Sequence, residues 1–334
     1  MANTLVEMER LSTDYTEKGI IQTIIKDNPL FEKLPFIEIV GNALKYNMET
    51  GLAGATWYQV GDVWGESTPI WAQRSAALTI LGGDADVDSF IAQTRSDVQD
   101  VEAAIIELKA KAIAHEFQNM LIRGATYHQT NANSMKGVMK LLAECQAEGA
   151  TTLDSLLNAQ VMNAAAADAP DTPVALSLPL LDKLVDLVLG GKPDFIMMSK
   201  AMRRKLTDLR RGAGSVITGL VTEYGTQVEA YNGIPVITND WIPDTMNTTA
   251  NVGGNPSLEL VSGAWYGTNA NSPIFAFQVG ENALCGLQNQ GIQTEKMGGL
   301  ETKDARRTRI KWYCAMTLFS TVKAAVMLNC APAL

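Results

Sequence analysis

The amino-acid sequence predicts an α+β fold, in which helices and strands are mixed without regular alternation. One long helical pattern runs over residues 97–123, and the last third of the chain is mostly strand-like. The steady strand–helix–strand rhythm that builds a parallel sheet is missing. With 334 residues, 46% of them hydrophobic, the chain is long enough to bury the cores of about two domains.

The N-terminal part of the chain holds one amphipathic pattern followed by turns and a short strand. Four isoleucines line one face of a predicted helix, and Asn28-Pro29 ends it; the isoleucines are Ile20, Ile21, Ile24 and Ile25. No basic and apolar leader of a secretory signal is visible at the N-terminus, and no apolar run is long enough to predict a membrane span.

Residues 51–83 predict an extended β-hairpin. Residues 56–60 and 76–80 are strand-like by residue type, and the polar stretch between them contains Gly and Pro. Trp57, Trp64 and Trp71 all fall in this segment, and a lone hairpin cannot bury so much aromatic surface. The rings therefore pack either on the rest of the same chain or on a neighbouring subunit.

The long helical pattern predicts a helix that lies along a sheet. Small or apolar residues recur in two rows on its surface, and it ends at Arg123-Gly124 with a cation and then a glycine. The rows are Val101, Ile105, Leu108 and Ala112, and Ile106, Ile113, Phe117 and Met120.

A change of composition near residue 170, Ala-rich and then Pro-containing, predicts a domain boundary. The chain beyond it reads as helix, buried strand over 194–198 and helix, with Ser177 and Ser199 as the two helix caps. Short strands follow, and the Gly233-Ile234-Pro235 stretch poses a question: it is either a ligand loop or a strand edge with a turn.

The composition argues against several functions. A formal net charge of -9 has the wrong sign for a protein that grips nucleic acid by neutralising phosphates. Glycine-rich nucleotide loops and nucleophile elbows are missing, and His115 and His128 are the only histidines. The four cysteines are widely spaced and predict reduced thiols; they are Cys145, Cys285, Cys314 and Cys330. We expect no catalytic, cofactor or metal residues.

Asp84, Asp86 and Asp88 alternate as in the first half of a calcium loop. Ser89 stands where that loop needs glycine, and Arg95 stands where it needs glutamate. We therefore expect these acids to favour the start of a following helix through its backbone N–H groups.

Two basic clusters remain. The first has six cations and one carboxylate between residues 200 and 211, and we expect its cations to pair with carboxylates of the same chain. In the second, Arg307, Arg309 and Lys311 alternate and so share one face of a strand. That spacing predicts an acidic counter-surface, either within the chain or on a neighbour.

The order of these segments resembles the major capsid protein of tailed bacteriophages, a family with the Hong Kong 97 fold that is shared with encapsulin shells. "GNALKYNMETGLAGATWYQVGD" and "LTILGGDADVDSF" resemble the entry to and exit from the extended E-loop, and "DVQDVEAAIIELKAKAIAHEFQNMLIRG" resembles the spine helix. "GGKPDFIMMSKAMRRKL" and "YGTQVEAYNGIPVITNDWIPDT" resemble the axial domain. "GIQTEKMGGLETKDARRTRIKWYCAMTLFS" resembles strands that return to the peripheral domain.

The resemblance implies five regions. They are an N-terminal arm (1–41), an E-loop hairpin (42–92), a peripheral domain with the spine helix (93–171), an axial domain (172–291) and return strands of the peripheral domain (292–334). It also implies that Gly233-Ile234-Pro235 is a strand edge and turn, and that arm and hairpin reach an adjacent subunit. The subunit-contact candidates are Trp57, Trp64, Trp71, Arg74, Arg307, Arg309 and Lys311.

The implied function is structural: a subunit that assembles into hexamers and pentamers of an icosahedral virion capsid enclosing double-stranded DNA without reading its sequence. It implies synthesis in the host cytoplasm and contacts with portal, decoration or scaffolding proteins, and no membrane partner. Because the chain begins almost at the arm, scaffolding is expected to be separate, removed or dispensed with. Some members weld subunits through an E-loop lysine, but residues 49–83 contain no lysine, so we expect no such crosslink. An encapsulin-like compartment housing a cargo protein is the alternative, and a hydrolase would require an essential histidine.

Overall fold

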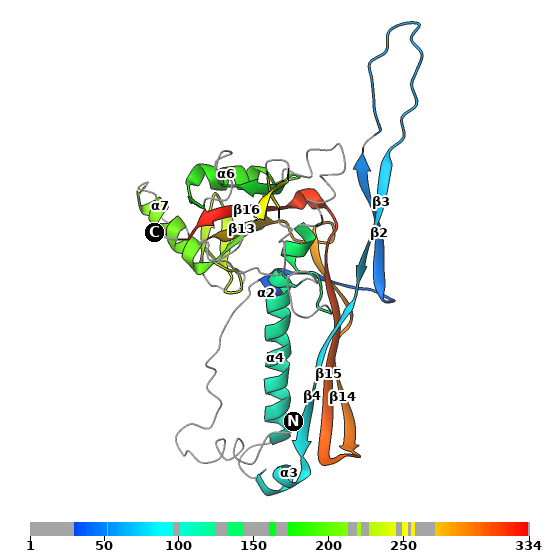
Figure 1. Cartoon of the computed structure of the whole chain (residues 1–334), viewed down its shortest axis with the longest axis vertical. Coiled ribbons are helices and arrows are strands. Elements are labelled where there is room, and N and C mark those ends of the chain that lie inside the picture. Colours follow the sequence, from blue (N-terminus) through cyan, green and yellow to red (C-terminus); the bar gives the residue numbers. More distant parts are fainter. Residues whose placement is uncertain are drawn as a thin grey trace.

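A computed structural model of the chain describes residues 30–51, 53–95, 101–124, 133–142, 144, 160–164, 173–212, 219–221, 227–244, 249–252, 255–257 and 271–332. Most of the expected arm, His128 and Cys145 lie outside these residues. Within them the molecule is elongated, as Figure 1 shows. A long two-stranded hairpin (β2 Ala43–Gly51, β3 Ile70–Ala77) extends at one end, and a sheet with a long helix extends to the other.

The long sheet has four strands in the order β1-β14-β15-β4, and β1 is the one parallel partner. Its strands are β1 Phe36–Glu38, β14 Leu284–Leu300, β15 Lys303–Leu318 and β4 Thr79–Asp88. Buried residues alternate along the outer half of β15, at Ala305, Thr308, Ile310, Trp312 and Cys314 after one irregular step. That alternation leaves one face of the sheet for the helix to cover and the other for charged side chains.

The helix that packs on this sheet is α4 (Val101–Arg123). Phe117 of α4 lies 4.4 Å from the Trp312 ring of β15, and Phe36 lies 5.6 Å from the same ring, both measured between centroids. The spine-helix prediction is thus confirmed over its described residues, including the end at Arg123. A short helix, α3 (Ser89–Arg95), follows β4 at the far end of the sheet (Figure 1).

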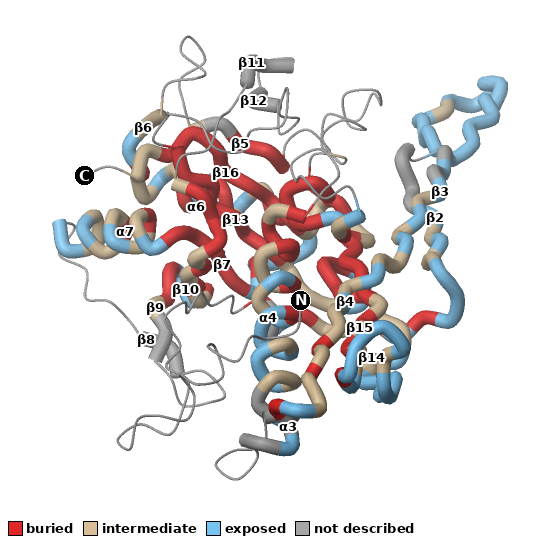
Figure 2. The backbone as a smooth tube through the Cα atoms, turned by 60° about the horizontal axis from the view of Figure 1, so that its bottom comes forward, coloured by how far each residue is buried: buried red, intermediate tan, exposed pale blue. Residues whose placement is uncertain are grey.

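The second sheet has eight strands, seven of them in the order β5-β16-β13-β7-β10-β9-β8, with β6 paired to β16. They are β5 Val161–Asn163, β6 Val174–Ala175, β7 Phe195–Met198, β8 Gly219–Val221, β9 Gln227–Tyr231, β10 Ile234–Thr238, β13 Ser272–Phe277 and β16 Ala324–Ala331. The inner strands are buried on both faces, which Figure 2 shows in red.

Two hydrophobic cores use the two faces of this sheet. Ile196 and Met198 point into one core with helices α6 (Leu178–Asp186) and α7 (Lys200–Gly212). Phe195 and Met197 point into the other, which also contains Phe117 and Trp312. Because this second core takes side chains from α4 and from both sheets, it joins the two sheets into one unit. We call this unit, with α4, α6 and α7, the body.

Local signals predicted the turn at Gly233 and one of the two expected helix caps. Asn232 and Gly233 have φ of 51° and 79°, and Tyr231 pairs with Ile234 across them. Positive φ at both central residues is what a two-residue hairpin turn requires, and Asn-Gly supplies it cheaply. The stretch is a strand edge and turn, as predicted. Ser199 caps α7 by accepting a hydrogen bond from Met202 N (3.3 Å), whereas Ser177 stands at the N-cap of α6 without such a bond.

Two expectations about strands are wrong. Residues 56–60 are not a strand, because the paired stem consists of β2 and β3, and residues 53–69 form an irregular tip. A turn at residues 59–62, with Gly61 at φ 99°, reverses the chain there. Aromatic and β-branched residues favour strands only where a half-buried pleated surface is available, and this tip has none.

The expectation that residues 292–334 all return to the peripheral domain is wrong for β16. Hydrogen bonds place β16 inside the eight-stranded sheet, between β13 and β5. Seven of its eight residues are buried, which suits a strand covered on both faces. A single turn of 3₁₀ helix, η2 (Thr321–Lys323), carries the chain from one sheet to the other. Likewise β4, inside the expected E-loop region, belongs to the four-stranded sheet, and β14 begins before residue 292.

The remaining described elements are short. They are α2 (Leu30–Lys33), ahead of β1, and the antiparallel pair β11 (Thr249–Val252) and β12 (Asn255–Ser257).

Candidate assembly surfaces

The hairpin tip, residues 53–69, is the most exposed apolar part of the described chain. Trp57, Val60 and Val63 have at least nine-tenths of their side-chain surface in water, and Trp64 is 77% exposed. Figure 2 shows the tip as a pale blue loop standing away from the body. Trp71, on β3, is 70% exposed. Exposed apolar patches of this kind are typical of surfaces that contact another molecule.

The tip has internal structure despite its exposure. The Tyr58 and Trp64 rings stack with centroids 4.3 Å apart and planes 19° apart. Gly65 N donates to the Tyr58 hydroxyl (3.1 Å), and Gly54 N donates to Ser67 Oγ (2.7 Å) across the loop. These contacts hold the loop in a defined shape before any partner is present, which lowers the conformational entropy lost on binding.

A charge ladder covers the face of the four-stranded sheet opposite α4. It consists of Asp84 and Asp86 on β4, Glu295 on β14, and Arg307, Arg309 and Lys311 on β15. Arg307 forms a bidentate ion pair with Asp86, with hydrogen bonds of 2.6 and 2.7 Å. Arg309 forms a second with Asp84, with hydrogen bonds of 2.7 and 2.9 Å. Lys311 Nζ lies 2.9 Å from Glu295 Oε2. The acidic counter-surface predicted for the three cations therefore lies within the chain.

The ion pairs of the charge ladder lower the pKa values of its aspartates. Hydrogen bonding to Arg309 lowers the pKa of Asp84, and hydrogen bonding to Arg307 lowers the pKa of Asp86. The expectation that these two acids serve the following helix is wrong, because they lie within β4 and face β15. Asp88 alone fits it, since its Oδ1 accepts a hydrogen bond from Phe90 N (2.8 Å) at the start of α3.

Three of the six cations of the basic cluster on α7 contact their own chain. Lys200 pairs with Asp240 at 2.8 Å, and Arg203 lies 3.6 Å from Glu229. Arg210 donates to the carbonyl of Ala230 and lies over the Tyr231 ring. The pairing expected for this cluster is thus found for Lys200 and Arg203.

The described residues offer little that resembles a catalytic centre. His115, in α4, is half-buried with its ring edge-on to Trp241, 4.7 Å away. Cys285, Cys314 and Cys330 are buried and unbridged, and burial raises the pKa of each thiol to about 12. Within these residues, no group of three His, Cys, Asp or Glu could hold a metal ion, and no helix is long and apolar enough to cross a membrane.

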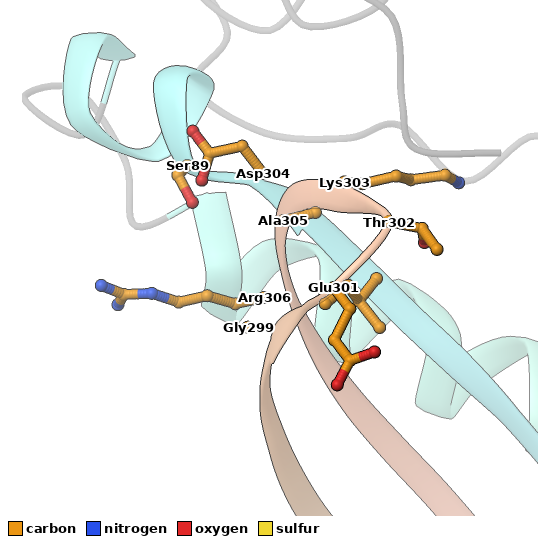
Figure 3. A pocket seen from close by; sticks show the side chains of 9 residues that line it. Ser89, Gly299, Glu301, Thr302, Lys303, Asp304, Ala305 and Arg306 are labelled. Atoms are coloured by element: carbon orange, nitrogen blue, oxygen red, sulfur yellow. The ribbon is translucent and has the colours of Figure 1, made fainter.

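A hollow of about 420 Å³ lies at the far end of the four-stranded sheet, between the β14–β15 turn and Ser89. Its four charged side chains, Glu301, Lys303, Asp304 and Arg306, point in different directions rather than toward one point (Figure 3). A small-molecule site needs converging polar groups, so this hollow is a surface feature of the turn.

Sequence reasoning identified the tryptophans and the alternating cations but missed their partners. The Tyr58–Trp64 stack has no sequence signature. By contrast, Asp84 and Asp86 alternate with the same period as Arg307 and Arg309, which signals that two strands could pair with opposite charges face to face. Arg74, another contact candidate, lies half-buried in β3 opposite Tyr46.

Comparison with known proteins agrees with the segment order. Residues 91–258, half of the chain, match the family model for the SU10 major capsid protein. No curated protein sequence matches the chain.

Solved structures of similar shape cover almost the whole chain at low sequence identity. The SrpI encapsulin complex of Synechococcus elongatus PCC 7942 has a TM-score of 0.66 at 15% identity and covers 100% of this chain and 98% of its own. The capsid of a native GTA particle has a TM-score of 0.61 at 14% identity, covering 98% of this chain and 99% of its own. Mycobacterium phage Ogopogo gives 0.60 at 14% identity, with the same coverage. Likeness at this identity establishes the fold, and the family match adds the role. The chain belongs to the SU10 major capsid protein family and is a structural subunit of a phage capsid with the Hong Kong 97 fold.

Proposed function

We propose that the hairpin tip of each subunit docks on an adjacent copy of the chain and that this contact closes hexamers and pentamers into an icosahedral shell. The observation that carries the proposal is an ordered loop presenting Trp57, Val60 and Val63 almost wholly to water. Trp71 and Arg74, on the stem, are further contact candidates of the same hairpin.

The energetics favour burial of the tip on assembly. Burying a large apolar side chain is worth about 1.5–3 kcal/mol before the costs of association. One such contact is weak, but a closed shell repeats it in every subunit. Symmetry therefore turns a marginal contact into a stable particle.

The position of the tip supports a contact that runs head to tail. The tip and the outer end of the four-stranded sheet lie at opposite ends of the molecule (Figure 1). A contact between unlike surfaces of identical subunits forms rings when the rotation closes. Arg307, Arg309 and Lys311 remain interface candidates, although their charges are already balanced by Asp84, Asp86 and Glu295.

The content of the shell is the second part of the proposal. We infer that it is double-stranded DNA, because the chain belongs to a phage capsid family. The net charge of -9 supports a shell that holds this DNA without binding its phosphates tightly or reading its sequence. Portal, scaffolding and decoration proteins are further partners on this view, and synthesis occurs in the host cytoplasm.

The test is electron microscopy of the purified chain and of a triple variant, Trp57→Ala with Val60→Ser and Val63→Ser. We expect closed shells or rings of five and six from the parent and unassembled, folded subunits from the variant. The matched control is Lys183→Ser with Asp186→Ser, two exposed positions on α6. Shells of normal size from the tip variant would overturn the docking role of the tip.

The nucleic acid is tested on particles recovered from infected or expressing cells. Nuclease-protected DNA inside the particles supports the virion role. A folded protein that co-purifies in place of DNA would instead support an encapsulin-like compartment.

A further inference from the structure

We propose that Tyr46 is a positioning residue that sets the angle at which the β2–β3 hairpin leaves the body, and thereby where the tip meets its neighbour. This inference rests on the proposed docking of the tip. It concerns the base of the hairpin, where the Tyr46 side chain is hydrogen-bonded to the end of β15.

The hairpin joins the body through two short links. The chain enters β2 after Gly41 (φ 107°) and Asn42, and it leaves β3 through Leu78, the one residue between β3 and β4. Leu78 N donates to the carbonyl of Asn42 (2.8 Å), which ties the two links together. The hairpin is a separate two-stranded sheet, so the ladder of the four-stranded sheet does not extend into it. We call residues 41, 42 and 78 the joint.

Apolar contacts alone leave such a joint free to tilt. Leu44, Ala76 and Leu78 pack against a small cluster formed by Ile39, Cys285, Leu287 and Ala315. These contacts lie at the joint itself, where they have little leverage, and hydrophobic contacts are not directional.

Tyr46 adds directional contacts farther out on the stem. It lies two residues beyond Leu44, on the same face of β2. Its hydroxyl donates to the carbonyl of Leu318 (3.3 Å) and accepts from Thr317 Oγ1 (3.2 Å). Its ring meets Phe319 edge-on, 4.8 Å away and at 73°. Both Thr317 and Leu318 are buried and belong to the body, so the acceptor and donor are fixed in place.

The neighbouring residue on β2 faces the other side of the hairpin. Asn47 is exposed, and its Oδ1 accepts a hydrogen bond from Gln73 of the same hairpin (3.4 Å). Tyr46 is thus the residue of β2 whose described contacts fix the stem to β15, beyond the joint.

A small change of angle at Tyr46 is amplified along the hairpin into a large displacement of the tip. The nine residues of β2 span about 30 Å at ~3.3 Å per residue, so a tilt of about 10° moves the far end by about 5 Å. Side chains that pack together have heavy atoms within about 4.5 Å, so such a shift removes the tip from its contacts. The identity of residue 46 therefore acts on the assembly contact through geometry, without being part of it.

The experiment measures the hairpin angle and assembly separately. Spin labels are placed on Thr68→Cys in the tip and Lys183→Cys on α6, and labelled chains are diluted with unlabelled ones so that only distances within one chain are seen. Chains without the two introduced cysteines report any labelling of native thiols. Distance distributions and particle images are recorded for the parent, Tyr46→Phe, Tyr46→Ala and Asn47→Ala.

We expect a narrow distribution in the parent and in Asn47→Ala. Tyr46→Phe loses both hydroxyl bonds and broadens the distribution, while Tyr46→Ala also loses the ring contact and broadens it further. The share of particles with the parent diameter falls in the same order. Tyr46→Phe keeps the ring and the fold, so it decides the matter even if Tyr46→Ala unfolds.

A parent-like distance width in Tyr46→Phe would overturn the inference. Failure of the proposed docking would look different. In that case the triple variant of the tip would assemble normally, while the Tyr46 variants would still show broadened distances.

Discussion

At the scale of single residues, the charge ladder shows how pairing decides the behaviour of ionisable groups. Asp84 and Asp86 stay charged because each accepts two hydrogen bonds from an arginine across the strand pair. The pKa of each carboxyl is therefore lower in the folded chain than in the unfolded one. A group of this kind adds stability above its unfolded pKa, and that stability is lost as the pH falls through the folded pKa.

Removing the ion pair between Asp86 and Arg307 should change how the stability of the fold depends on pH. With Asp86→Asn, we expect a melting temperature a few degrees lower at neutral pH and a shallower loss of stability below about pH 4, where unfolded aspartates take up protons. Arg307 keeps Asp84 as a partner at 3.4 Å, which limits the effect. Thermal melts from pH 7 to pH 2 measure it, with the exposed Asp304→Asn as the matched control. Curves for Asp86→Asn and the parent that run parallel would contradict the assignment.

The buried cysteines lead to a second prediction at this scale. Cys285, Cys314 and Cys330 have thiol pKa values raised to about 12 by burial, so almost no thiolate exists at pH 8. Titration with Ellman's reagent should therefore find at most one reactive thiol among the four in the native chain. All four should react in denaturant. Two or more reactive thiols before unfolding would be inconsistent with the described core.

At the scale of elements, the hairpin and the end of α4 show opposite uses of glycine. In the tip, Gly61 with φ 99° allows the turn, and a side chain there would meet open space. At the end of α4, Gly124 is needed for space. A Cβ on Gly124 would clash with the Met135 carbonyl oxygen and would lie 2.5 Å from that of Met120.

Gly124→Ala should therefore destabilise the subunit. Overpacking against fixed backbone atoms costs about 1–3 kcal/mol. Denaturant unfolding measures the loss. The matched control is Gly212→Ala at the end of α7, where a Cβ would meet no heavy atom within 4 Å. Equal stability of the two variants would show that the segment around Met135 can move away at little cost.

The aromatic residues of the hairpin make its docking visible by fluorescence. Trp57, Trp64 and Trp71 are exposed in the single chain, whereas Trp241 and Trp312 are buried. If the tip docks on a neighbour, tryptophan emission should move to shorter wavelength as shells form. Trp57→Phe should reduce this shift, while Trp312 continues to report a buried ring in both states. An unchanged spectrum on assembly would mean that the tip stays in water.

At the scale of the whole molecule, the sequence predicted which segments form helices, turns and strands better than it predicted which strands pair with each other. Residues with strong local signals behaved as expected: Arg123-Gly124 ended a helix, a turn lies at Gly233, and the strand predicted over 194–198 is buried at Phe195–Met198. The failures concern pairing. The segment 56–60 has strand-forming residues but no neighbouring strand, and β16 joins a different sheet from the strand that precedes it.

The candidate assembly surfaces also combine features that the sequence shows with contacts that only folding creates. Trp57 and Trp64 stood out by their residue type alone, and the alternation of Arg307 and Arg309 predicted a shared face. The stack of Trp64 on Tyr58 and the bonds of Tyr46 to β15 depend on chain segments brought together by folding. A contact of the latter kind, 272 residues apart in sequence, leaves no local pattern to read.

The whole particle provides a test of covalent linkage. Because residues 49–83 contain no lysine, we expect mature particles to dissociate in denaturant and to run as single chains on a denaturing gel. A ladder of covalent multimers would show that the subunits are crosslinked. A lysine elsewhere would then have to be found by mass spectrometry.

The core shared by the two sheets has a mechanical consequence. Trp312 of the long sheet and Phe275 of the eight-stranded sheet belong to one close-packed cluster, and close-packed interiors resist compression. Force applied to a subunit from inside a filled shell would therefore pass through the body as through a stiff plate. Deformation would be concentrated in the thin hairpins that connect one body to the next. The stiffness of the whole particle would therefore be set by these hairpins and not by the close-packed bodies.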